Sequence, residues 1–254
     1  MKGNLTIDIG NTWVKVAYYL GTKLVATNRF AGGDGQVLDR FISTYKPDTA
    51  ILCSTASPAV TQDIVRLAKS RCRTVLQLTH ETPMPIRLDY RTPETLGRDR
   101  IATAVGAWSL VHDAHENSDV LVIDAGTAIT YDLTLADGCF VGGNIAPGVG
   151  LRFAALHEHT GRLPLVSPQG EMPLVGYDTP TAIRSGVLLG VLGEVSSYID
   201  ALSATHPGLK VFLAGGDGKW IHDNLEGIRA DYYEHLAAEG LNRILLYNQA
   251  NGNC

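Results

Sequence analysis

Short runs of apolar residues, separated by polar turns, follow the same order in both halves of the chain. From Asn4 to Phe30 the pattern predicts a strand, a polar turn, a second strand, a tight turn at Gly21-Thr22 and a third strand. The segment from Val120 to Ile145 predicts the same order, with its tight turn at Asp137-Gly138. The Asp-Gly pair predicts a type I′ turn, in which both central residues take positive φ. Two such openings at matching spacing indicate an internal repeat.

After each opening the pattern changes to helices and strands in alternation, which predicts an α/β protein of two halves, each a mixed β-sheet flanked by helices. The elements expected are helices over 37–45, from Ser57-Pro58 onward and from Thr179-Pro180 to Leu202, and strands over 49–53, 75–78 and 210–214. The most polar connector, His112 to Asp119, separates the halves. The predicted domains are therefore residues 1–115 and 116–254.

Composition and charge narrow the class of protein. The 254 residues are 45% hydrophobic and 19% charged, which excludes disorder over most of the chain. A net charge of -5 without charge runs argues against nucleic-acid and membrane partners and favours small molecules. The best apolar run, Val187 to Leu192, is interrupted by Gly190, Gly193 and Glu194, so no membrane span is expected. The four cysteines lack C-x-x-C spacing, so no zinc site is expected. Asp8 lies where a signal peptide would need its apolar segment, which predicts a cytoplasmic protein.

The repeated Asp-x-Gly sequence carries the candidate chemistry. Asp8 to Thr12 and Asp124 to Ala128 each bring a carboxylate, a flexible turn and polar donors into one hairpin. Glycine lets backbone N–H groups approach a phosphate, Thr12 or Thr127 can add a donor, and the carboxylate can hold a hydrated cation. Ordinary hairpins with favourable turn residues are the alternative for either motif alone. Because the motif occurs twice, the sequence favours phosphate binding across a cleft between the halves.

Four stretches resemble motifs of the type III pantothenate kinases, a family of the acetate and sugar kinase, Hsp70 and actin superfamily. They are Asp8-Ile9-Gly10-Asn11-Thr12 with Lys15, Gly97-Arg98-Asp99-Arg100, Asp124-Ala125-Gly126-Thr127-Ala128-Ile129-Thr130, and Gly142-Gly143-Asn144-Ile145-Ala146-Pro147-Gly148. The resemblance runs in the family's order from Leu5 to about Gly218. It implies two ribonuclease-H-like (actin-like) halves with a cleft between them. It also implies ATP-dependent phosphorylation of pantothenate to 4′-phosphopantothenate, the first step of coenzyme A biosynthesis.

The resemblance assigns roles to individual residues. Asp99 is implied as the general base that accepts the hydroxyl proton, and Arg98 and Arg100 would help to keep it ionised. Asp8 is implied to lie near Mg²⁺, and Asp124 to bind a monovalent cation, K⁺ or NH₄⁺. The implied ATP-binding residues are Asp8, Ile9, Gly10, Asn11, Thr12, Trp13, Val14, Lys15 and Thr127. The implied substrate-binding residues are Tyr90, Gly97, Arg98, Asp99, Arg100 and Thr179. A homodimer is also implied.

Several of these residues also have simpler structural interpretations. Gly97 to Arg100 is also typical of an acidic helix start, Lys15 of an exposed strand, and Thr179 of a helix N-cap. His157 and His159 are interpreted as surface residues, because an i, i+2 pair on a helix points apart. Gly215-Gly216 resembles the superfamily's adenine-side loop. For function, the alternatives are a kinase or phosphatase acting on another small substrate, or a non-catalytic transcriptional accessory protein of the same fold.

Overall fold

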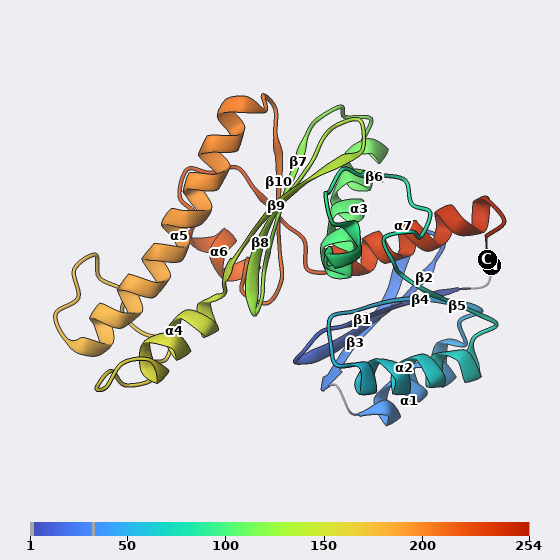
Figure 1. The fold of residues 1–254 in the computed structure, drawn as a ribbon, viewed down its shortest axis with the longest axis horizontal. Coiled ribbons are helices and arrows are strands. Elements are labelled where there is room, and N and C mark those ends of the chain that lie inside the picture. Colours follow the sequence, from blue (N-terminus) through green and yellow to red (C-terminus); the bar gives the residue numbers. More distant parts are fainter. Residues whose placement is uncertain (1–2, 32–33, 254) are drawn as a thin grey trace. The chain divides into compact units, whose positions relative to one another are not determined.

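The computed structural model describes residues 3–31 and 34–253, so Cys254, Gly32 and Gly33 lie outside the described residues (Figure 1). The chain forms two compact units. The first contains Met1–Asn117, Leu135–Val141 and His235–Cys254, and the second contains Ser118–Thr134 and Gly142–Glu234. The units therefore group residues 135–141 and the C-terminal segment with the first part of the chain, whereas the sequence predicts halves of 1–115 and 116–254.

The first unit contains a five-stranded mixed sheet in the order β3-β2-β1-β4-β5. Its strands are β1 (Asn4–Ile9), β2 (Trp13–Leu20), β3 (Lys23–Ala31), β4 (Thr49–Ser54) and β5 (Thr74–Gln77). The strands of the predicted opening, β1 to β3, are antiparallel, and β1, β4 and β5 are parallel. The helices are α1 (Gly35–Tyr45), α2 (Pro58–Arg71), α3 (Arg98–Asp113) and α7 (Leu236–Ala250), with the short elements β6 (Arg87–Leu88) and η1 (Pro93–Thr95).

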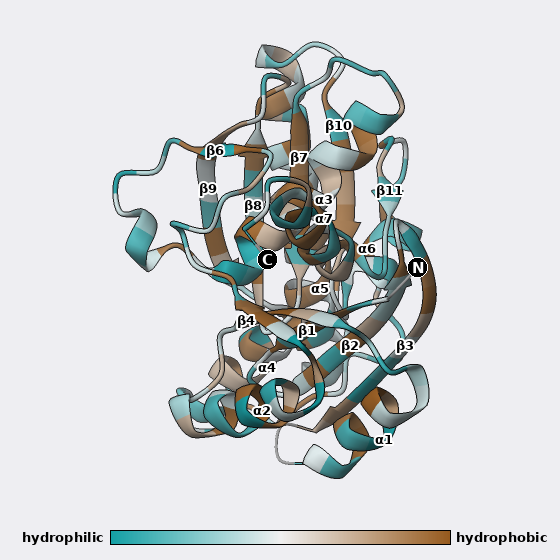
Figure 2. Cartoon of the chain, turned by 90° about the vertical axis from the view of Figure 1, so that its right-hand side faces the viewer, coloured by the Kyte–Doolittle hydropathy of each residue, from teal (hydrophilic) through white to brown (hydrophobic). Residues whose placement is uncertain are grey.

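The alternation of side chains along β1 decides which residues face which helices. Leu5, Ile7 and Ile9 are fully buried in the cluster formed with α1 and α2. Asp8 therefore points to the opposite face of the sheet. On that face Ile51 and Cys53 of β4 pack with α3 and α7. Figure 2 shows both hydrophobic and hydrophilic residues on α1 and α2, as expected of helices that cover a sheet on one side only.

Helices α3 and α7 pack backbone to backbone through two glycines. A Cβ atom on Gly240 would overlap the carbonyl oxygen of Ala102, and one on Gly106 would lie 2.5 Å from the carbonyl oxygen of Leu236. At the same contact Arg243 bridges the carboxylates of Asp113 on α3 and Glu239 on α7, at 2.6 and 2.7 Å. The close approach of the two helices thus depends on the absence of a side chain.

Buried polar contacts attach α7 to the sheet. The Asn4 Nδ2 donates to Asn242 Oδ1 at 3.0 Å, and Asn242 Nδ2 donates to the Gly21 carbonyl at 2.9 Å. The Gln249 amide donates to Asn4 Oδ1 and to Thr49 Oγ1. The last helix of the chain is therefore fastened to its first strand.

The second sheet has the order β11-β10-β7-β8-β9-β6. Its other elements are β7 (Val120–Ala125), β8 (Ala128–Thr134), β9 (Cys139–Pro147), β10 (Lys210–Ala214) and β11 (Asp231–Tyr232), with helices α4 (Val149–Glu158), α5 (Thr179–Thr205) and α6 (Gly218–Asn224). The start of β9 and β6 belong to the first unit, and the rest belongs to the second. Ile123 and Ile129 of the β7–β8 hairpin pack with the apolar side of α5. The predicted fold class, two mixed sheets with flanking helices, is confirmed.

One local prediction, the type of a turn, and one alternative interpretation, the role of Thr179 as N-cap, are wrong. The Asp137-Gly138 turn is not type I′, because among its residues only Gly138 has positive φ, at 81°. The Gly138 N–H donates to the Leu135 carbonyl at 2.9 Å, so the central residues of the turn are 136 and 137 instead of Asp137 and Gly138. Gly138 follows the turn and takes the left-handed conformation. Thr179 is not the N-cap of α5. Asp178 holds that position, where its carboxylate accepts from the Thr181 N–H at 2.8 Å in a capping box.

Helix α5 also differs from the sequence expectation for membrane spans. The residues expected to interrupt an apolar run lie inside one continuous helix of 27 residues. By length and composition this helix could cross a membrane, with a mean hydropathy of 1.4. A core helix of a soluble protein meets the same criteria, and α5 packs one side on the core through Val187, Val191 and Val195. The length and composition of this helix are therefore not sufficient to assign it to a membrane.

Candidate active site

Three chemically active side chains form a row across the first sheet. Asp8 near the end of β1 pairs in register with Lys15 on β2 and with Cys53 on β4. Directly opposite residues project from the same face of a sheet. The row therefore presents a thiol, a carboxylate and an ammonium group side by side. Lys15 is exposed, as the plainer interpretation of the sequence expects, and it also acts electrostatically on Asp8.

Asp8 and Asp99 form a pair of interacting carboxylates. Burial raises the pKa of Asp8, the Asp99 charge raises it further, and the Lys15 charge and a hydrogen bond from Cys53 oppose this rise. The Cys53 Sγ donates to Asp8 Oδ1 at 3.4 Å. The pKa of the Cys53 thiol is raised by burial and by both carboxylates, so this cysteine stays protonated and acts as a donor. Two neighbouring carboxylates beside a lysine make a site suited to a bound cation and phosphate groups.

Gly97 makes room for the Asp99 carboxylate at the start of α3. Asp99 lies in the first turn of the helix, and its Oδ1 accepts from the Arg100 backbone N–H at 2.9 Å. A Cβ atom on Gly97 would lie 2.5 Å from the same oxygen. The backbone at Gly97 has an ordinary φ of -54°, so glycine is needed here because it lacks a side chain and not because of its backbone conformation. The glycine of the Gly-x-Asp-Arg sequence thus leaves room for this position of the carboxylate, which the Arg100 N–H holds.

The two arginines beside Asp99 have different surroundings. Arg98 donates from its guanidinium to the carbonyls of Pro93 at 3.1 Å and Glu94 at 2.9 Å, which ties α3 to the preceding short helix. Arg100 is buried, with its guanidinium carbon 5.9 Å from the centre of the Tyr90 ring. This contact brings Tyr90 and Arg100 together within the first unit. For Arg98, these contacts supply a structural role, and its contact with substrate stays a prediction.

The turn between β1 and β2 is a short loop open to solvent. The Gly10 N–H donates to the Trp13 carbonyl at 3.0 Å and closes the loop. Asn11, Thr12 and Trp13 are exposed. Ile9 and Val14, both fully buried, anchor its two ends in the core. A loop with exposed polar donors between fixed ends is suited to bind phosphate.

The second unit places Asp124 at the corresponding end of β7. Asp124 pairs in register with Thr130 on β8, whose Oγ1 is buried and has no hydrogen-bond partner. Gly215 after β10 has a φ of 85°, and a Cβ atom there would overlap Asp124 Oδ1. In the hairpin itself Thr127 is exposed, and its carbonyl accepts from the Gly148 N–H at 3.0 Å. The glycine-rich end of β9 therefore contacts the second Asp-x-Gly hairpin.

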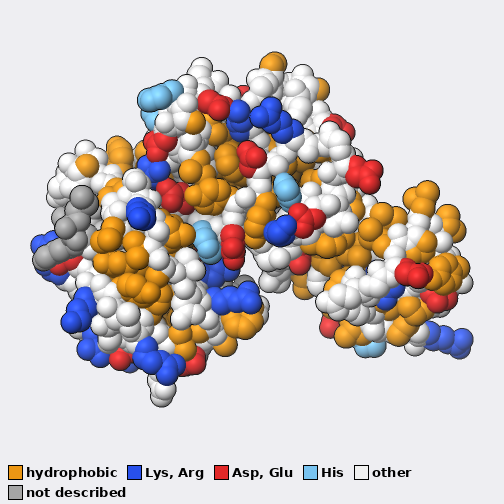
Figure 3. Space-filling model, turned by 180° about the vertical axis from the view of Figure 1, so that it is seen from behind, with side chains coloured by type: hydrophobic (Ala, Val, Ile, Leu, Met, Phe, Trp, Pro, Cys, Tyr) orange, Lys and Arg blue, Asp and Glu red, His pale blue; other side chains and the backbone are white. Residues whose placement is uncertain are grey.

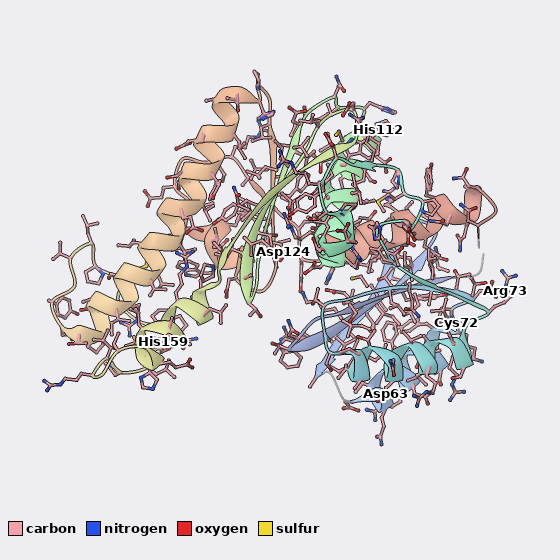
Figure 4. All side chains as sticks on the ribbon, viewed as in Figure 1. Asp63, Cys72, Arg73, His112, Asp124 and His159 are labelled. Atoms are coloured by element: carbon pink, nitrogen blue, oxygen red, sulfur yellow. The ribbon has the colours of Figure 1, made fainter. Side chains whose placement is uncertain are left out.

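Not every predicted residue of the second unit is brought to this hairpin. Thr179 begins α5, and the first turn of that helix lies beside α4, whereas Asp124 is on the β7–β8 hairpin (Figure 4). His157 and His159 are both exposed, as predicted, and His157 Nδ1 is bonded to the Leu163 carbonyl. In the described part of the chain, no three His, Cys, Asp or Glu side chains form a metal cluster.

Sequence reasoning missed Cys53 and Thr130 as neighbours of the two aspartates. Both lie one strand away from an aspartate, at a matching register position. The signal for Thr130 is its place in the hairpin, six residues after Asp124 across a two-residue turn. Cys53 offers only the end of an apolar strand, because its pairing with β1 is a contact between distant segments. Gly215 was noticed only as part of a glycine pair.

The sequence model of the type III pantothenate kinase family matches residues 4–201. A type III pantothenate kinase from Phocaeicola vulgatus is 43% identical over 248 residues, which cover 96% of this chain and 98% of the relative. One from Porphyromonas gingivalis is 41% identical over 253 residues, covering 98% and 100%. The similarity therefore extends over nearly the whole length of both relatives.

Solved structures show the same fold at low sequence identity. A protein from Campylobacter jejuni, described as a Baf family transcriptional activator, matches with a TM-score of 0.61 at 20% identity and covers 98% of this chain and 100% of its own. A glucokinase from an Antarctic psychrotroph matches at 0.53 and 12%, covering 98% and 99%. MreB 5 of Spiroplasma citri matches at 0.51 and 11%, covering 99% of both chains. These likenesses concern the fold alone.

Proposed function

The chain belongs to the type III pantothenate kinase family, and on that premise we propose which of its residues carry out the reaction. The reaction is ATP-dependent phosphorylation of pantothenate to 4′-phosphopantothenate, the first step of coenzyme A biosynthesis. Family membership selects this activity among the alternatives that the sequence leaves open. The observation that carries the residue assignment is the strand register that sets Asp8 opposite Lys15, with the Asp99 carboxylate close enough to raise the pKa of Asp8.

Asp99 is the general base of the proposal. Phosphoryl transfer needs positioned reactants, neutralised charge and a group that takes the hydroxyl proton. The Asp99 carboxylate is half-buried at the first turn of α3, with Gly97 leaving space around one oxygen. One oxygen is held by the Arg100 N–H. The other oxygen can accept the proton of the primary hydroxyl of pantothenate as that oxygen bonds to the γ-phosphorus and the bond to ADP breaks.

Lys15 and the two Asp-x-Gly loops are proposed to bind ATP. The exposed loop from Gly10 to Trp13 offers backbone N–H groups and the side chains of Asn11 and Thr12 to phosphate oxygens. Thr127 offers an equivalent exposed hydroxyl from the second unit. The Lys15 ammonium neutralises charge that develops on the transferred group.

The first-unit carboxylates fit Mg²⁺. This ion is usually held by one or two carboxylates together with substrate phosphates. Asp8 offers a carboxylate whose charge is disfavoured by burial and by Asp99, so a nearby dication would stabilise it. We propose that Asp8 holds Mg²⁺ directly or through water. When bound, the ion neutralises phosphate charge for the attack.

The second-unit residues fit a monovalent cation. Asp124 supplies a carboxylate, and the buried Thr130 hydroxyl opposite it lacks a hydrogen-bond partner. A buried unpaired hydroxyl is costly, and an oxygen-ligated cation would satisfy it. We propose that Asp124 and Thr130 contribute oxygen ligands to K⁺ or NH₄⁺.

Tyr90, Gly97, Arg98, Arg100 and Thr179 are proposed to bind pantothenate. The strongest physical support is for Tyr90 and Arg100, because the Arg100 guanidinium carbon lies 5.9 Å from the centre of the Tyr90 ring and Arg100 follows Asp99 directly in the first turn of α3. The Arg100 guanidinium is buried and charged, so it suits an anionic substrate. Thr179 is supported by its exposure at the start of α5, where the capping is done by Asp178 and leaves the Thr179 hydroxyl available.

A direct assay tests the substrate and the cations together. Purified protein with ATP, Mg²⁺ and pantothenate is expected to form 4′-phosphopantothenate, detected by mass spectrometry. Replacing K⁺ by tetramethylammonium at equal ionic strength is expected to lower the rate, and Asp124→Asn is expected to reduce this K⁺ dependence. Asp223→Asn, which changes an exposed carboxylate on α6, is the matched control. Absence of product in every salt would contradict the activity, and an equal K⁺ response in both variants would remove Asp124 from the cation site.

A homodimer is proposed from the surface of the second unit. One face of α5 consists of small exposed residues, namely Ala182, Gly186, Gly190, Gly193 and Ser197. Apolar side chains elsewhere in this unit are also exposed, namely Ile145, Leu165, Leu174, Val175 and Tyr177. Figure 3 shows hydrophobic side chains on the surface of this unit at the right of the view. Small residues allow close helix approach, and exposed apolar residues mark interaction surfaces.

We expect Ser197→Arg to turn the dimer into a monomer, because a long cation would occupy the close helix contact. Analytical ultracentrifugation measures the mass. Ser70→Arg on α2 is the control, since Ser70 is also an exposed helical serine that donates to a backbone carbonyl. A dimer of unchanged affinity in Ser197→Arg would contradict the use of this face.

A cytoplasmic location is also proposed, supported by the three described cysteines, which are all unpaired thiols.

A further inference from the structure

A fourth residue continues the row of active side chains to the edge of the first sheet. Arg29 on β3 pairs in register with Lys15 on β2, as Lys15 pairs with Asp8 on β1. The next residue, Phe30, is buried in the cluster with α1 and α2, so Arg29 points to the opposite face, which also carries Lys15. β3 is the edge strand of this sheet. The Arg29 side chain is therefore exposed at the margin of the candidate site.

The side chain of Arg29 is held by Trp13. Its guanidinium carbon lies 5.3 Å from the centre of the Trp13 ring. Trp13 is the first residue of β2, directly after the exposed loop, and 45% of its surface is exposed. A cation above an indole face is attracted by the ring, and this contact limits the rotamers of the arginine. The loop that is proposed to bind phosphate thus also orients a guanidinium beside itself.

Towards the edge of the sheet, on the side of β2 and β3, the two neighbouring charges are both positive. Like charges directly opposite each other on neighbouring strands destabilise a sheet. Lys15 and Arg29 form such a pair, and Arg29 has no ion pair with a carboxylate anywhere in 3–31 or 34–253. Asp8 lies on the far side of Lys15 and is partly buried. A bound polyanion next to the loop would compensate both cations.

We propose that Arg29 is an ATP-binding residue, which acts with Lys15 on the β- and γ-phosphates while Trp13 serves as its platform. The inference rests on the proposed ATP-binding role of the first loop and deepens it. Arginine presents a fork of donors that matches phosphate oxygens, whereas lysine acts as a point charge. Because Trp13 already restricts the guanidinium, little conformational entropy is lost when phosphate binds. A purely structural Arg29 would only cover the Trp13 ring.

Nucleotide affinities distinguish these two roles. Arg29→Met keeps the apolar contact with Trp13 and removes the charge. We expect its Kd for ATP to rise about tenfold, the size of one charge-assisted contact at an exposed site, and its Kd for AMP to stay unchanged. Arg29→Lys is expected to recover part of the loss because it keeps the charge. Isothermal titration without pantothenate measures each Kd, and Arg66→Met on α2, with a 77% exposed side chain, is the matched control.

Two outcomes overturn the inference. One is an ATP affinity in Arg29→Met equal to that of the parent protein, and the other is an equal loss of ATP and AMP affinity, which would point away from the terminal phosphates. Thermal unfolding of each variant shows whether its fold is intact, and Arg29→Lys provides the same comparison should Arg29→Met be unstable. These titrations involve no turnover. A failure of the pantothenate assay therefore contradicts the proposed function separately, without altering the reading of the ATP and AMP affinities.

Discussion

Replacing Asp99 by asparagine is expected to lower kcat by about 10²- to 10⁴-fold, the usual contribution of a general base. Asparagine keeps an oxygen that can accept from the Arg100 N–H, so the start of α3 is preserved. It cannot accept the proton of the substrate hydroxyl. The change also removes the negative charge that raises the pKa of Asp8, so that pKa falls and the Asp8 carboxylate is charged over a wider pH range. ATP binding should therefore persist.

Product formation and ATP binding must both be measured for this variant. Mass spectrometry of 4′-phosphopantothenate gives kcat, and titration calorimetry gives the Kd for ATP. Asp63→Asn serves as the control, because Asp63 is an exposed carboxylate on α2. Turnover near that of the parent protein would remove Asp99 from the role of base. A combined loss of turnover and ATP binding would assign Asp99 to nucleotide binding instead.

Replacing Gly240 by alanine is expected to lower the free energy of unfolding by about 3 kcal/mol, the upper part of the usual range for overpacking. The new Cβ atom would overlap the Ala102 carbonyl, which belongs to the backbone of α3 and cannot rotate away. Helices α3 and α7 would have to separate, and their shared core with Ile101, Val105 and Leu241 would loosen.

Urea unfolding followed by circular dichroism measures this loss. Gly150→Ala is the matched control, because Gly150 lies in α4 with open space around its Cβ position. Alanine favours helix over glycine, so the control is expected to be neutral or slightly stabilising. Equal unfolding midpoints for Gly240→Ala and the parent protein would show that the two helices can separate at no cost.

The sequence predicted the parts of the fold that depend on local patterns. Both three-strand openings formed as expected, because alternating apolar residues and glycine turns act within about 30 residues. The turn at Asp137-Gly138 was predicted in place but not in type, since Asp-Gly suits several hairpin turns and the hydrogen bond to Leu135 selected another. At α5, Asp178 rather than Thr179 became the cap, because a carboxylate accepts the helix N–H groups more strongly than a hydroxyl does.

The candidate site was predicted less completely than the fold. Motifs placed Asp8 and Asp99 on two elements, but only the structure shows that the Asp99 charge raises the pKa of Asp8. The neighbours Cys53 and Arg29 are set by strand register between segments that are 45 and 21 residues from Asp8 along the chain. The periodicity of apolar residues within one segment does not predict which distant strands pair or in which register. The contacts of Arg98 with the Pro93 and Glu94 carbonyls likewise depend on a loop path that local patterns do not determine.

The attachment of the last helix to the first strand affects how the protein folds during its synthesis on the ribosome. Asn4 and Asn242, which bond to one another, are 238 positions apart, so Asn4 leaves the ribosome long before its partner. During that interval β1 and the loop beside it lack α7, and the apolar side chains of Ile51 and Ile101 lack one wall of their core. Domains that need late residues cannot finish folding during synthesis. The first unit is thus the first to begin folding and the last to be completed, and nascent chains stay exposed to chaperones and proteases until α7 emerges.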